Sequence, residues 1–154
     1  MATADLFGER RASKMAARMT SFAAEFAVEM KLPERVPFTM RPLAASEYAR
    51  DQGKLEPFRD ALMDAHWLYG KDIESDADLS GAAKLVGISP DETIAAADSP
   101  EYRGRIARVR EQAFDQMVTA IPTFVFGSYP VVGCQRYETL LKVVTKIGID
   151  RRDS

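Results

Sequence analysis

The sequence has few of the residues that build disulfide, metal and redox centres. Its 154 residues include one cysteine and one histidine. One cysteine excludes a disulfide within the chain, and one histidine with one cysteine excludes an ordinary zinc cluster. Long apolar runs are also missing, since none approaches the length needed to span a bilayer. We therefore expect no metal, no cofactor and no membrane partner.

An excess of charge of either sign is missing as well, because the formal net charge is only −2. Such a chain lacks the basic surface that attracts nucleic acids, so we expect no nucleic-acid partner. Near the N-terminus, Asp5 and Glu9 interrupt short apolar pieces, which is unlike a signal peptide, and the expected location is cytoplasmic. With 46% hydrophobic and 29% charged residues, the composition is that of a globular protein, and we predict a single domain over 1–154.

A long amphipathic helix is predicted from residue 5 to about residue 30. Three methionines and two phenylalanines recur there at helical spacing, at Met15, Met19, Phe22, Phe26 and Met30. Methionine-rich faces sometimes form plastic binding surfaces, but a stripe at this spacing is more often part of a core. We therefore expect the stripe to be buried.

Three further helices are predicted from their ends. Gly53, Gly70 and Gly87 each follow an apolar helical pattern, where a left-handed cap residue is needed. Asp76 and Asp78 are both candidate N-caps for the third of these helices. The first two predicted ranges are 43–52 and 55–69, and the third helix carries Leu79, Ala82, Ala83 and Val86 and ends at Gly87.

Two sequence signals mark the starts of the next helices. Ser89 precedes a proline and is followed three residues later by Glu92, which together form a capping-box pattern. Ser99 also precedes a proline and opens a helix with an apolar stripe at Tyr102, Ile106, Val109, Ala113 and Met117. A last helix carries Tyr137, Leu140, Leu141 and Val144. The prediction is about seven helices.

The segment between the last two helices reads as a β-hairpin. Thr123–Phe126 is β-branched and aromatic, Gly127 and Ser128 suit a turn, and Tyr129–Val132 is a second short apolar run. Pro130 cannot donate to a sheet ladder and predicts an edge strand. Pro122 stands between the end of a long helix and the start of a strand, and predicts a cis peptide bond with Ile121. The fold class is therefore α+β and predominantly helical.

These motifs carry a family resemblance. The run from Ile121-Pro122 through Phe126, followed by Val132-Gly133-Cys134-Gln135 and a helix, resembles the C-terminal half of the DsbA-like thiol:disulfide oxidoreductases, in particular the FrnE-like branch. The segments 47–54 and 58–73 agree. The resemblance implies an incomplete DsbA-like thioredoxin fold, with 5–118 as the helical insertion and 119–148 as the closing ββα unit. The Cys-x-x-Cys motif of the family has no counterpart in this sequence.

The resemblance also implies a function. Pro122, with Ala120 and Ile121, would hold the backbone of a substrate, which would be a protein thiol or a small thiol. Because the dithiol is absent, we expect a truncated or redox-inactive form that does not catalyse disulfide exchange by itself. The alternative is a non-catalytic helical module for binding or dimerisation. A weaker alternative is a glutathione-dependent isomerase similar to the kappa-class transferases.

The single cysteine and the single histidine give no catalytic pair. Cys134 precedes a helix, which can activate a thiol, but it has no resolving partner and free cysteines are commonly buried, so we expect it to pack. His66 lies beside Trp67 with no nucleophile signalled near it, so a structural or surface role is expected. No charge or proline interrupts Thr123–Phe126, and its outer edge predicts either a homodimer or an aggregation-prone monomer.

Overall fold

The computed structural model describes residues 5, 8–31 and 35–149. The chain forms two compact units, the first ending at Ala107 and the second beginning at Arg108, and each is described here by itself. No helix among the described residues is both long and apolar enough to cross a membrane. The boundary between the units falls within one helix, because α7 covers Pro100–Asp115.

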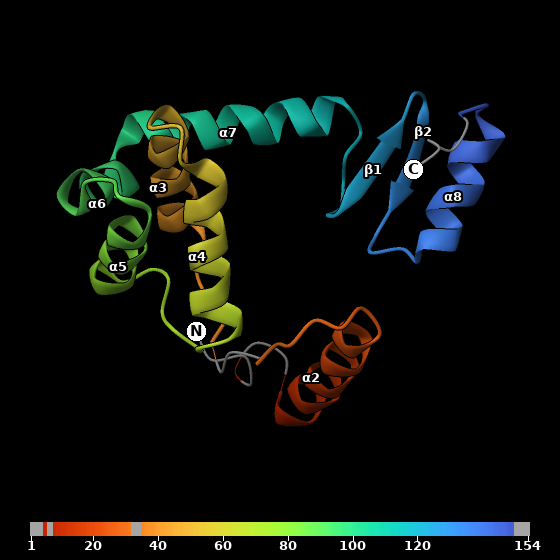
Figure 1. Cartoon of the computed structure of the whole chain (residues 1–154), viewed down its shortest axis with the longest axis horizontal. Coiled ribbons are helices and arrows are strands. Elements are labelled where there is room, and N and C mark those ends of the chain that lie inside the picture. Colours follow the sequence, from red (N-terminus) through yellow and green to blue (C-terminus); the bar gives the residue numbers. More distant parts are fainter. Residues whose placement is uncertain (1–4, 6–7, 32–34, 150–154) are drawn as a thin grey trace. The chain divides into compact units, whose positions relative to one another are not determined.

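The first unit is helical (Figure 1). Its described helices, before α7, are α2 (Glu9–Ala24), α3 (Met40–Asp51), α4 (Leu55–Trp67), α5 (Asp76–Val86) and α6 (Pro90–Asp98). With α7 and the later α8, the seven predicted helices are all present, and the predominantly helical α+β class is confirmed. The helix predicted to carry Leu79, Ala82, Ala83 and Val86 is α5, which starts at Asp76 and ends at Val86.

The ends of these helices follow the expected capping chemistry, with one correction. Gly53, Gly70 and Gly87 have φ angles of 67°, 64° and 76°, so each adopts the left-handed conformation that its position requires. The N-cap of α5, however, is neither Asp76 nor Asp78. Ser75 takes this place, and its side-chain hydroxyl accepts a hydrogen bond from the backbone N–H of Asp78 at 3.1 Å. The two aspartates lie in the first turn instead, where their negative charge interacts favourably with the positive end of the helix dipole.

The core of the first unit lies between α3, α4, α5 and α6. α3 packs against α4 and α6, and α5 packs against the same two helices. The largest fully buried side chains are Phe58, Leu79 and Thr93. Burial of an aliphatic or aromatic side chain of this kind stabilises the fold by roughly 1.5–3 kcal/mol. The remaining members of the core cluster are Ala45, Ala49, Leu62, Ile73, Ala82, Ala83 and Ala97.

Polar side chains join the same helices around the rim of this core. Arg41 of α3 donates to Asp76 of α5 at 2.6 Å and to Asp98 of α6 at 2.8 Å, and also to the carbonyl of Glu74. These bonds lower the pKa of Asp98, with the hydrogen bond from Arg41 as the largest cause. One guanidinium therefore links three segments that are far apart in the sequence.

The capping box of α6 forms only in part. Ser89 accepts a hydrogen bond from the backbone N–H of Glu92 at 3.3 Å, as predicted. The carboxylate of Glu92 accepts from the hydroxyl of Tyr48 in α3 rather than from the Ser89 backbone. Burial, followed by this hydrogen bond, raises the pKa of Tyr48 to about 12. Glu92 thus joins α6 to α3 through its hydrogen bond with Tyr48.

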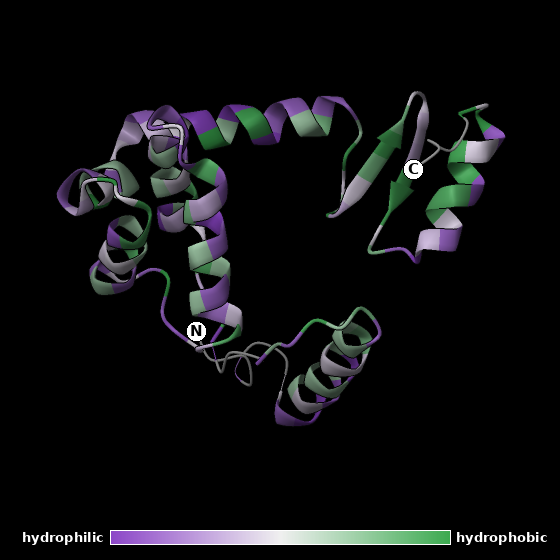
Figure 2. Cartoon of the chain, in the orientation of Figure 1, coloured by the Kyte–Doolittle hydropathy of each residue, from purple (hydrophilic) through white to green (hydrophobic). Residues whose placement is uncertain are grey.

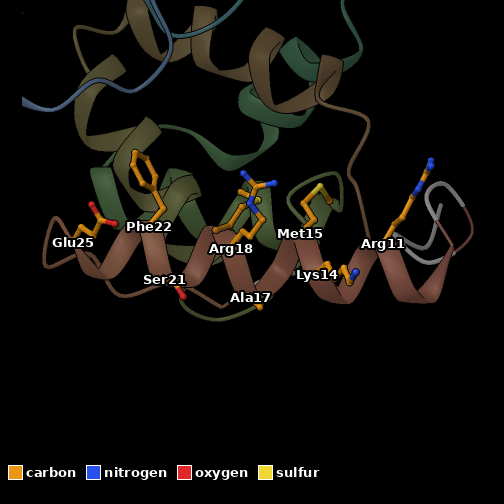
Figure 3. Close-up of a pocket in the computed structure, with 9 residues that line it drawn as sticks. Arg11, Lys14, Met15, Ala17, Arg18, Ser21, Phe22 and Glu25 are labelled. Carbon is orange, nitrogen blue, oxygen red and sulfur yellow. The ribbon is translucent and has the colours of Figure 1, made fainter. Parts of the chain in front are cut away.

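The stripe of α2 corrects a prediction. No side chain of Glu9–Ala24 is buried. Phe22 and Phe26 contact each other edge to face, with 5.1 Å between their ring centroids, and both remain exposed. Met15, Arg18 and Phe22 project from one side of the helix (Figure 3). The periodicity correctly predicted an amphipathic helix, but the expectation that its apolar face joins the core is wrong. The helix also ends at Ala24, short of the predicted residue 30.

The second unit contains the hairpin and the last helix. Strands β1 (Thr123–Phe126) and β2 (Tyr129–Val132) are antiparallel and form a two-stranded sheet, and α8 covers Tyr137–Lys146. Figure 2 shows that hydrophobic residues concentrate on these strands and on α8. Even so, none of the described side chains in the second unit is buried.

Candidate functional site

The segment before β1 has the predicted geometry. The peptide bond between Ile121 and Pro122 is cis. The hydroxyl of Thr123 donates to the carbonyl of Ala120 at 2.6 Å, so a short local hydrogen bond spans the bend. Ile121 is 91% exposed, and Ala120 and Pro122 are exposed as well. The structure therefore presents all three predicted site residues on the surface of the second unit.

The hairpin register determines which peptide groups of β1 are already used. Phe126 lies opposite Tyr129 and flanks the two-residue turn, and the N–H of Gly133 donates to the carbonyl of Pro122 at 2.7 Å. Bonded and non-bonded pairs alternate in an antiparallel ladder, so Phe124 and Phe126 bond to β2. The peptide groups of Thr123 and Val125 point away from β2. Because the sheet of the described residues has only two strands, this outer edge of β1 is open.

Pro130 fits the same register. It lies opposite Val125, in a non-bonded pair, so its missing N–H removes no bond from the ladder. The prediction that Pro130 marks an edge strand is confirmed. Gly127 has a φ of 61° at the first turn position, the place where a two-residue II′ turn needs glycine.

Cys134 departs from the prediction. It follows β2 as a free thiol, and it is exposed rather than packed. The prediction that Cys134 is packed was wrong because none of the described side chains in the second unit is buried, so this unit has no interior for a small residue to enter. An exposed thiol without a second cysteine can form a mixed disulfide but cannot resolve it within the chain.

Comparison with known proteins decides the family. The family model of the DSBA-like thioredoxin domain matches residues 2–145. The chain belongs to this family. No curated protein matches the chain. The resemblance inferred from the hairpin motifs is therefore confirmed.

Two solved structures share the DSBA-like fold of this chain. A probable DsbA oxidoreductase from Streptomyces coelicolor has a TM-score of 0.77 at 20% identity, over 94% of this chain and 64% of that one. A 2-hydroxychromene-2-carboxylate isomerase has a TM-score of 0.75 at 13% identity, over 91% of this chain and 67% of that one. At these identities the likeness shows the fold alone. The chain spans about two thirds of the length of either structure, which agrees with a partial DsbA-like fold.

The other predicted features of this DSBA-like chain lie elsewhere. His66 belongs to α4 in the first unit and is buried, and its ring packs edge to face against Trp67. Asp76 pairs with Arg41, and the described residues contain no group of three side chains that could hold a metal ion. Sequence reasoning missed that the Nδ1 atom of His66 is buried without a hydrogen-bonding partner in the described protein. No sequence signal could have found this, because it depends on which side chains meet in the folded unit.

Proposed function

We propose that this chain is a redox-inactive DSBA-like protein that binds an extended polypeptide along the outer edge of β1, next to Ala120, Ile121 and Pro122. The open edge supports this proposal best. Thr123 and Val125 offer their N–H and C=O groups away from β2, in the arrangement that an added strand needs. The exposed side chain of Ile121 offers apolar contact at the start of the same edge.

Redox inactivity follows from the thiol count. Dithiol exchange by the family mechanism needs two thiols in the active protein, and this chain supplies Cys134 alone. In the reduction of insulin by dithiothreitol, the added chain should give the same rate as buffer. Acceleration that vanishes in Cys134→Ser would contradict this part of the proposal.

Binding is tested separately, with an extended peptide that contains one cysteine and NMR spectra of the ¹⁵N-labelled chain. We expect the amide signals of Thr123 and Val125 to shift most. Val125→Pro removes an outward N–H without touching the ladder, and it should weaken binding. Val132→Pro is the matched control, because Val132 points its N–H away from β1, on the opposite edge of the hairpin. Equal effects of the two prolines would contradict binding at the β1 edge.

A second copy of the chain is the alternative occupant of the same edge. No charged residue or proline lies within Thr123–Phe126, and such residues are the usual protection of an open strand. Sedimentation over a range of concentrations distinguishes the two occupants. A dimer that Val125→Lys dissociates would favour self-association, whereas a monomer that binds the peptide would favour a polypeptide partner.

A further inference from the structure

The end of α7 carries a residue type that its conformation does not favour. The N–H of Met117 donates to the carbonyl of Phe114 at 2.8 Å. The N–H of Val118 donates to the carbonyl of Ala113 at 2.9 Å. This pair of bonds closes a helix around one left-handed residue, which here is Met117 with a φ of 59°. The same pair closes α3, α5 and α8, and the left-handed residue there is a glycine: Gly53, Gly87 and Gly148.

Methionine is strained in this conformation, because its Cβ crowds the backbone, whereas glycine has no Cβ. Contacts of the side chain within the protein do little to offset this strain, since Met117 is 85% exposed. The other described non-glycine residue with a positive φ is Ala27 after α2, whose side chain is a single methyl group. Strained residues cluster where ligands bind, so the long, exposed side chain of Met117 is a candidate contact for a ligand.

Met117 lies on the same unit as the open edge of β1 and close to it in the sequence. It precedes Thr123 by six residues and Ile121 by four, and Ile121 is 91% exposed. Six residues of chain span at most about 21 Å. A bound strand that continues about six residues beyond Thr123 is therefore long enough to reach both Met117 and Ile121.

This part of the chain carries no charge. Residues 116–135 include no aspartate, glutamate, lysine, arginine or histidine, although 29% of the whole chain is charged. A charged side chain of a bound segment would lose water here without an opposite charge from this stretch, which is unfavourable. An apolar side chain would instead bury the exposed surfaces of Met117 and Ile121, and methionine adapts to side chains of different shape.

We propose that Met117 and Ile121 select the polypeptide that binds at the β1 edge, by favouring an apolar side chain over a charged one of either sign. This inference rests on the proposed binding of an extended polypeptide to that edge, and it names the class of segment that binds. The bound segment is uncharged and has an apolar residue beyond the part that pairs with Thr123 and Val125. Met117 makes this contact at a cost in stability that glycine would avoid.

Three capped ten-residue peptides test the class of segment. They have threonine at every second position, and leucine, glutamate or lysine at the positions between. In NMR titrations of the ¹⁵N-labelled full chain, the leucine peptide should shift the amide signals of Met117, Thr123 and Val125. The glutamate and lysine peptides should each bind about tenfold more weakly, because neither charge meets a counter-charge. Equal binding of the three peptides, or a preference for either charged peptide, would overturn the proposal.

Met117→Gly separates the contact from the strain, because the two predict changes of opposite sign. The variant should raise the urea midpoint of the second unit, since glycine adopts this φ without strain. It should nevertheless weaken the leucine peptide about tenfold, because the apolar contact is lost. Ala27→Gly is the matched control, since it relieves the positive φ in the first unit and should leave peptide binding unchanged.

Ile121→Ala provides a second test in the same unit. It should weaken the leucine peptide several-fold, whereas Ile149→Ala, which shortens another exposed isoleucine, should not. If the leucine peptide shifts Thr123 and Val125 but both site variants keep its affinity, the selection by these residues is wrong and binding at the edge stands. If no peptide shifts the β1 amides, this inference and the proposed function both fail.

Discussion

The bundle of α3, α4, α5 and α6 and the ββα unit both contain apolar residues, but only the bundle buries them. In the bundle, Phe58 is fully buried and Leu62 is 3% exposed. In the ββα unit, Val125 remains 59% exposed, and no described side chain is buried. Four helices enclose a core, whereas two strands and one helix offer faces without an interior. A two-stranded hairpin is marginally stable in water, so we expect the second unit to be the less stable of the two.

The largest expected effect is in the bundle. Leu62→Ala should reduce the free energy of unfolding by about 2–5 kcal/mol, because it removes buried methyl groups and leaves a cavity. Val125→Ala, in the other unit, should change it by less than about 0.5 kcal/mol, because that side chain is mostly exposed. Urea unfolding followed by circular dichroism measures both. Similar losses for the two variants would mean that the hairpin has a core of its own.

A smaller effect is expected at the rim of the bundle. Arg41→Gln removes the contacts with Asp76 and Asp98, and should cost about 1 kcal/mol, since these carboxylates are partly screened by solvent. Arg50→Gln is the control, because Arg50 pairs only within α3, with Glu47 three residues earlier. The same urea experiment applies, and a loss no larger than that of the control would show that Arg41 does not join the helices.

The pH dependence sharpens the same point. The pKa of Asp98 is lowered in the folded chain, so its stabilising contribution is present above the unfolded pKa near 3.9 and disappears as the pH falls through the lower, folded value. Unfolding free energies measured between about pH 5 and pH 2 should therefore fall less steeply in Arg41→Gln than in the unchanged chain. Parallel slopes would exclude Arg41 as the cause of the lowered pKa.

The smallest effect is expected at Pro130. Pro130→Ala adds an N–H that points away from β1, so the exchange protection of the Phe124 and Phe126 amides should stay within a few-fold of its original value. Val131→Pro, by contrast, removes a donor that bonds to Phe124 and should abolish that protection. Hydrogen exchange followed by NMR measures both variants. Loss of protection in Pro130→Ala would show a different register.

Local chemistry explains why the helices could be predicted. Left-handed glycines, a serine before a proline, and a proline before a strand act within a few residues, and the structure has Gly87, Ser89 and the cis bond at Pro122 as expected. The cap of α5 was misjudged because serine and aspartate are equally good caps, so composition could not choose between Ser75 and its neighbours.

Tertiary contacts explain what could not be predicted. The spacing of the apolar residues shows that α2 is an amphipathic helix, but periodicity does not tell what covers its apolar face. The exposed thiol of Cys134 and the buried Nδ1 of His66 depend on which surfaces meet, and no local pattern encodes that. The cis bond before β1 was predictable because the residues that favour it are neighbours in the sequence.

The bond between Arg41 and Asp98 has a consequence for how the chain assembles. It joins residues 57 positions apart, because the first helix of the bundle packs against the last. During synthesis α3, α4 and α5 emerge before α6, and until then the side of α3 that faces α6 has no partner. The chain loses the entropy of closing this long loop before the contact can stabilise it, and this slows folding. A nascent chain halted before Asp98 would leave Arg41 without this partner, and the side of α3 that packs against α6 would stay open to chaperones and proteases until α6 emerges.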